Sequence, residues 1–240
     1  MKDFIKRLTK KSKEKIAIIK KTHMINRVSM YKDYGFAAIK IIFGIFVQSY
    51  FFIVSGLYSI CIGFAKMSFF NGKKIGEKLD PNSREYRENE YRHLARMAFF
   101  ILMGSIIYVI YMARLFFISS AYNYGEIPAI TIAAVSFTEM TLSIIHLRKA
   151  KGALFTGLRS VNLTSAFTAI VLTQVAILSF VDEADYSFYN ALSGTIFGGL
   201  CIVVAIIMFG YYFSYKKKAS KIEMSTKKEG STNDKEQSAN

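Results

Sequence analysis

Long apolar blocks separated by short polar connectors constrain this chain more than any other feature. Between Tyr34 and Tyr215 each block runs for about 17–27 residues, which is the length that a helix needs to cross about 30 Å of hydrocarbon. Hydrophobic residues make up 52% of the chain, and only two of its 240 residues are proline. The pattern predicts an all-α polytopic transmembrane helical bundle. It excludes a disordered chain, a disulfide scaffold and a soluble nucleic-acid binder.

Four of the blocks predict single membrane spans: Ala98–Ser119, Pro128–Ile145, Val161–Val181 and Phe188–Tyr212. Their connectors alternate in charge. The outer turns carry acids, and all but three of the 32 Lys and Arg residues fall in the N-terminal tail, Asn71–Arg96, Arg148–Arg159 and the C-terminal tail. Because basic loops stay on the cytoplasmic side, we expect a multi-pass protein of the cell (plasma) membrane with both termini in the cytoplasm.

The block from Tyr34 to Phe70 is apolar almost throughout and has basic residues on both sides. A single crossing would place the basic loop Asn71–Arg96 outside or invert the later spans, whereas an even number of crossings avoids both. We therefore predict a hairpin with arms Tyr34–Val47 and Phe51–Met67 that turns at Gln48-Ser49-Tyr50, giving about six membrane helices in total. The arms are short, so the hairpin is re-entrant or tilted. One long tilted helix is the alternative.

Three short motifs in this chain resemble those of a known group of membrane proteins, and the resemblance supports this arrangement. They are the runs Phe43–Phe52, Leu158–Leu163 and Leu172–Leu178. In these motifs, and in the order and spacing of its spans from Tyr34 to Phe213, the chain resembles a family of small bacterial multi-spanning membrane proteins of unassigned function. The resemblance implies the hairpin, because such sequences place a polar residue, a serine and paired aromatics at that turn. It implies no activity and no site residues.

Polar segments flank the predicted membrane domain, 34–215. The polybasic tail 1–33 is weakly amphipathic and is expected to lie on anionic lipid headgroups. The tail 216–240 has almost no apolar residues and is expected to be disordered. In the cytoplasmic loop 71–96, Asp80 and Pro81 predict the start of a helix, which Arg84, Glu88 and Arg92 would stabilise through i,i+4 pairs. No folded module accompanies the charge, so no nucleic-acid partner is expected.

The predicted span Pro128–Ile145 and its end carry a polar stripe. Ser136, Glu139, Ser143 and His146 follow one another at spacings of three or four residues and share one helical face. Glu139 lies near the middle of the bilayer, where a charged side chain is costly and marks a candidate functional site. Candidate partners are Arg114, Gln174 and Lys40. The stripe predicts either a cation or proton path or a polar contact that holds helices together.

Small residues line one face of the last predicted span. Gly194 and Gly198 form a GxxxG motif, which Ala191 extends, and this motif favours close packing between membrane helices. The neighbour is either the preceding span, which the short turn between the two favours, or a second copy of the protein.

Signatures of catalysis are absent from the sequence. Cys61 and Cys201 are isolated in apolar spans, the three histidines are far apart, and no phosphate-binding loop or hydrolase motif occurs. We expect no enzymatic activity, no catalytic residues, no cofactor and no metal. The expected function is that of an accessory or interacting subunit of a membrane assembly, with a membrane protein or a second copy as its partner. The alternative is a small transporter or channel for a cation, a proton or a small solute, working through Glu139.

Overall fold

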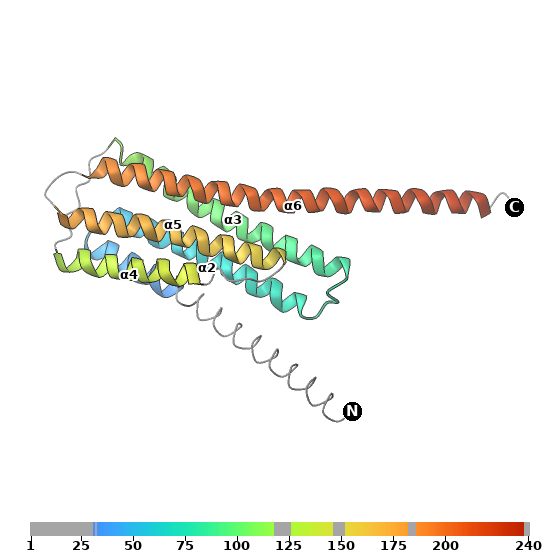
Figure 1. Cartoon of the computed structure of the whole chain (residues 1–240), viewed down its shortest axis with the longest axis horizontal. Coiled ribbons are helices and arrows are strands. Elements are labelled where there is room, and N and C mark those ends of the chain that lie inside the picture. Colours follow the sequence, from blue (N-terminus) through green and yellow to red (C-terminus); the bar gives the residue numbers. More distant parts are fainter. Residues whose placement is uncertain (1–30, 32, 118–125, 146–151, 182–185, 238–240) are drawn as a thin grey trace, which may run out of the picture.

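The computed structural model describes residues 31, 33–117, 126–145, 152–181 and 186–237; the side chains of 126–129, 139, 142–145, 179–181 and 222–237 are outside this description. The described residues form helices and no strands (Figure 1). After a helical segment at 33–46 come α2 (Tyr50–Gly76), α3 (Arg84–Arg114), α4 (Glu126–Ile145), α5 (Ala153–Val181) and α6 (Ser187–Gln237).

Helices α2, α3, α5 and α6 form a bundle around one apolar core. Contacts join α2 to α3, α3 to α6, α6 to α5 and α5 to α2, with α3 also touching α5 across the bundle. Helix α4 packs on the outside of α5. Successive labelled helices run in opposite directions, so the α2–α3 connection and the start of α5 lie at one end, and the starts of α2, α4 and α6 lie at the other (Figure 1).

Four helices are long and apolar enough to cross a membrane: α2, α3, α5 up to Leu178, and α6 up to Lys221. Three of them contain most or all of a predicted span. Helix α4 contains the predicted span Pro128–Ile145 but is not among the four, which were identified from the described residues alone. On α3 and α6, large apolar side chains such as Ile110, Val203 and Ile206 are at least half exposed. A continuous apolar outer surface of this kind suits contact with lipid.

The chain turns at residues 47–49, between the helical segment 33–46 and α2. The Ser49 amide donates to the Gly44 carbonyl at 2.8 Å, and Gln48 adopts a positive φ of 53°. Phe43 and Phe52 meet edge to face across the turn, with ring centroids 5.1 Å apart. The predicted second arm, Phe51–Met67, is only part of a helix that continues to Gly76. Helix α2 is therefore long enough for a complete crossing, whereas the sequence predicted a short arm here.

The start of α3 differs from the prediction. Asp80 and Pro81 lie in a turn, where the Asp80 carboxylate accepts from the Asn82 amide at 3.0 Å. The helix begins three residues later, because the Ser83 hydroxyl accepts from the Tyr86 amide at 3.0 Å and caps it. Both Asp and Ser are good caps, so composition alone does not separate the two positions. The predicted i,i+4 pair of Glu88 with Arg92 is present at 2.8 Å.

Glycines bring the helices of the bundle close together. Gly104 of α3 lies against Tyr58 and Cys61, and Gly157 of α5 lies against Leu94 and Met97. The GxxxG motif contacts α3: Gly194 lies against Met112, and Gly198 against Val109 and Tyr108. Of the two neighbours that the sequence left open, the preceding span was favoured, but the two glycines lie against α3 instead. The short connection does bring α5 and α6 into contact, but the small-residue face of α6 points to α3.

Helix α6 continues far beyond the apolar part of its sequence. The prediction that 216–240 would be disordered was wrong for residues up to Gln237, which are helical. No proline interrupts this region, and a helix that already exists extends without a new nucleation step. The predicted amphipathic tail 1–33 lies almost entirely outside the described residues.

We predict that Gly198→Leu destabilises the bundle by about 1–3 kcal/mol, as overpacking of a close contact does. A Cβ at this position would come within 2.5 Å of Val109 Cγ2, and the β-branched valine has little rotamer freedom with which to move away. The matched control is Gly199→Leu, because a Cβ there has nothing within 4 Å. Thermal unfolding in mild detergent measures the difference. Equal melting temperatures for the two variants would contradict the close α3–α6 packing.

Candidate functional site

A buried ion pair joins the helical segment 33–46 to α2. The Lys66 ammonium lies 2.5 Å from the Asp33 carboxylate, and each side chain is only 1% exposed. Taking two charges out of water costs several kcal/mol per ion, and only close pairing offsets that cost. The pair therefore fixes the end of the segment against α2 at a defined register.

A second polar contact lies two turns closer to the 47–49 turn. The Lys40 ammonium is 5% exposed and donates to the Ser59 hydroxyl at 3.0 Å, and that hydroxyl donates to the Ser55 carbonyl at 3.1 Å. Small residues allow this approach, since Gly56 lies against Ile41 and the Ala37 carbonyl, and Gly63 lies against Tyr34. Lys40 and Asp33 thus lie on one face of the segment, directly opposite Ser59 and Lys66.

Lys40 was predicted as a candidate partner of Glu139, whereas the pairing of Asp33 with Lys66 was not predicted. A signal was present: Asp33 and Lys66 are equally distant along the sequence from the bond between Ser49 and Tyr50, and so are Lys40 and Ser59. In an antiparallel hairpin, residues at equal distances from the turn face each other. Asp33 was assigned to the tail because the apolar block begins one residue later.

The predicted stripe on α4 is described only in part. Ser136 is fully buried, and its hydroxyl has no hydrogen-bond partner among the described residues. Ile132, one turn earlier on the same face, is also buried. The side chains of Glu139 and Ser143 and the whole of His146 lie outside the described residues. The structure therefore does not test the predicted role of Glu139.

Arg114 and Gln174, the other predicted partners of Glu139, occupy different surroundings. Arg114 is the last residue of α3, and its side chain is exposed. The Gln174 amide of α5 donates to the Tyr189 carbonyl of α6 at 3.5 Å, a long hydrogen bond that joins neighbouring helices. This described contact of Gln174 joins α5 to α6.

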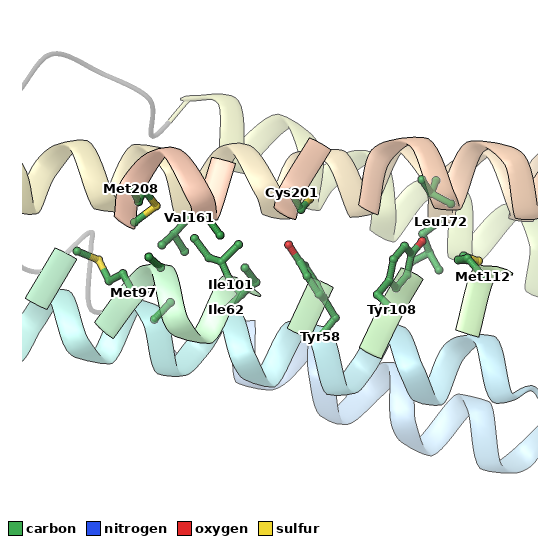
Figure 2. Close-up of a cluster of buried hydrophobic side chains, with 14 of the residues drawn as sticks. Tyr58, Ile62, Met97, Ile101, Tyr108, Met112, Val161, Leu172, Cys201 and Met208 are labelled. Atoms are coloured by element: carbon green, nitrogen blue, oxygen red, sulfur yellow. The ribbon is translucent and has the colours of Figure 1, made fainter. Parts of the chain in front are cut away.

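Polar atoms also meet in the middle of the bundle, among its buried apolar side chains (Figure 2). Tyr58 of α2 and Tyr108 of α3 have ring centroids 5.8 Å apart, and their hydroxyls point toward α6. The Cys201 thiol donates to the Thr164 carbonyl of α5 at 3.7 Å. The Tyr58 hydroxyl lies close to the side chains of Thr164, Cys201 and Ser105, whereas the Tyr108 hydroxyl has no hydrogen-bond partner among the described residues. Four helices thus contribute to one polar centre that the sequence analysis did not identify.

Interhelical polar contacts hold the basic end of the bundle. The Ser68 hydroxyl of α2 lies 3.1 Å from His93 Nδ1 of α3, and the Asn89 amide donates to the Gly72 carbonyl at 2.7 Å. The Glu90 carboxylate accepts from the Ala153 amide at the start of α5. Gly152, which precedes that start, has a φ of +119° and leaves room for this carboxylate. Glycine suits this position because other residues rarely adopt such a φ.

Comparisons with known proteins add no function to this geometry. No protein-family model matches the chain, and no curated protein matches it. The resemblance to small bacterial multi-spanning proteins therefore stays a prediction. Within the described ranges, no group of three or more His, Cys, Asp and Glu side chains could hold a metal ion. Several of the described polar side chains join one helix to another, and others bond to backbone within their own helix.

We predict that Lys66→Met destabilises the protein by about 3–5 kcal/mol, because it leaves the Asp33 carboxylate buried without its partner. The double variant Asp33→Asn with Lys66→Met should recover most of this loss, since it leaves no unpaired charge. Thermal unfolding in detergent measures both. Glu88→Gln, which breaks the exposed pair with Arg92, is the control and should cost no more than about 1 kcal/mol. A double variant no more stable than Lys66→Met would contradict the ion-pair assignment.

Proposed function

We propose that the protein is an integral membrane protein without enzymatic activity that serves as an accessory or interacting subunit of a membrane assembly. The observation that carries this proposal is the shape of α6. It is one helix of 51 residues that crosses the bundle and then projects beyond it (Figure 1). At about 1.5 Å per residue, the part beyond Tyr215 is about 33 Å long. A projecting helix of this length offers contact surface to a partner.

The described interior of the bundle supports a structural role. Large side chains such as Tyr108, Met97 and Met112 are almost completely buried and fill the space between α2, α3, α5 and α6 (Figure 2). The ionic contact of Asp33 with Lys66 and the hydrogen bond of Lys40 with Ser59 join helices to one another. Polar groups used in this way stabilise packing in a membrane. The alternative of transport through Glu139 lacks such support, because the side chain of Glu139 lies outside the described residues.

The proposed topology places both termini in the cytoplasm and inserts 33–46 and α2 as a hairpin in the plasma membrane. Exposed basic residues at one end of the bundle support this orientation. Lys74, Lys78 and Arg87 lie where α2 ends and α3 begins, and Lys217 lies on the part of α6 that passes this end (Figure 1). At the opposite end, the described ranges contain a single basic residue, Arg114. The positive-inside rule puts the basic end in the cytoplasm.

Cysteine labelling of intact cells tests the topology. In a variant without Cys61 and Cys201, we predict that Tyr50→Cys reacts with a membrane-impermeant maleimide from outside, and that Asn82→Cys reacts only after the membrane is permeabilised. Tyr50 is chosen because it is 63% exposed next to the turn, whereas Ser49 is fully buried. Labelling of both positions from the same side would rule out the proposed hairpin.

Affinity purification in mild detergent tests the function. We predict that the full chain recovers a second membrane protein, or a differently tagged copy of itself, and that a chain ending at Lys221 recovers much less. The shortened chain keeps every described bundle contact, so its melting temperature should not change. Recovery of the full chain as a monomer, after cross-linking in cells, would count decisively against the proposal.

A further inference from the structure

A pocket of about 320 Å³ lies between α3 and α6 at the basic end of the bundle. Arg84 and Glu88 line it from α3; Tyr212, Tyr215, Lys216 and Ser220 line it from α6. Its volume falls within the range of sites that bind small molecules or parts of them, about 300–1,000 Å³. It uses none of the polar groups inside the bundle.

The packing of α3 against α6 fixes the shape of this pocket. Tyr91 and Tyr215 stack with ring centroids 4.1 Å apart and planes 6° from parallel. Glu88 and Arg84 lie one and two turns before Tyr91 on the same face of α3. On α6, Lys216 and Ser220 follow the stacked Tyr215 toward the projecting end. The stacked rings therefore mark the side of the pocket nearest the bundle core, and the charged residues lie beyond them.

The lining favours an anion with several oxygen acceptors. Arg84 and Lys216 supply two cations, and two tyrosines and a serine supply hydroxyl donors. Glu88 is the acidic residue that lines the pocket. Its carboxylate is paired with Arg92 at 2.8 Å, so the net charge around the pocket stays positive. The pocket also lies beside the first turn of α3, which begins at Arg84 and presents the positive end of its helix dipole.

The position of the pocket relative to the membrane surface indicates the source of the anion. Tyr211 and Tyr212 end the apolar part of α6, and three lysines follow Tyr215 directly. Tyrosines in this position mark the layer of lipid headgroups. Basic pockets between transmembrane helices at the cytoplasmic surface bind the headgroups of anionic lipids. A phospholipid can reach this site from the membrane while its acyl chains lie along the exposed apolar faces of α3 and α6.

We infer that this pocket binds the phosphate group of an anionic phospholipid headgroup, with Arg84 and Lys216 as its cationic contacts. The site differs from the expected contact of the polybasic tail 1–33 with lipid, because it is a defined pocket with two named cations. It does not depend on the existence of a protein partner.

Native mass spectrometry of the full chain in detergent tests the inference. Phosphatidylglycerol and phosphatidylcholine are the probes, and the fraction of protein carrying one bound lipid gives the affinity. The test variant is Arg84→Gln with Lys216→Gln. The matched control is Arg87→Gln with Lys217→Gln, which removes the same charge from exposed neighbouring positions on the same two helices that are not among the lining residues. Melting temperatures establish that both variants are folded.

The expected result is selective binding of phosphatidylglycerol by the natural chain and the control, and a loss of about tenfold or more in the test variant, because two cations leave the headgroup. Arg84→Lys with Lys216→Arg should retain binding, since both charges remain. Equal losses in test and control variants would overturn the inference, because general attraction to the basic end would then explain binding. Displacement of the lipid by inorganic phosphate would overturn the lipid assignment and point to a soluble phosphate ligand.

Discussion

Hydrocarbon offers no hydrogen-bond partners, and this constraint underlies the rest of the structure. Every backbone amide within the membrane must find an internal partner, which is why the apolar blocks form continuous helices. Lipid also removes the usual hydrophobic drive for helices to associate, so close contact has to come from small residues and polar groups. Both devices are visible here: glycines face large side chains on neighbouring helices, and a few buried polar atoms bridge them.

The polar groups in this bundle show how one chemical pattern supports two interpretations. An ionisable residue inside a membrane is a candidate for transport because burying it is costly. The same cost makes a correctly paired residue a strong determinant of register, since a slip of one position would leave a charge without its partner. Asp33, Lys66 and Lys40 fit the second interpretation, because their contacts join two antiparallel helices in one register, centred between Ser49 and Tyr50. We therefore favour a packing role for the described intramembrane charges.

The length of the apolar blocks and the charge of their connectors made the helices predictable, because each can be read from one stretch of sequence without knowing its neighbours in the fold. The turn near Gln48 was predictable in the same way. The pairing of Glu88 with Arg92 was predictable from helical spacing. Partners between helices were harder to predict. The GxxxG face could have met α5 or a second copy, and its contact with Met112 and Val109 of α3 depends on how the whole bundle closes. Composition also misled at residues 216–237, since polar residues do not break a helix that is already formed.

The continuity of α6 has a mechanical consequence. A helix without a break transmits tilt, so the projecting end acts as a rigid arm that pivots where Tyr215 stacks on Tyr91 of α3. For an arm of about 33 Å, a tilt of about 10° moves the tip by about 6 Å. Changes in bilayer thickness that alter the tilt of this span would therefore be converted into displacement in the aqueous phase, where another molecule could sense them.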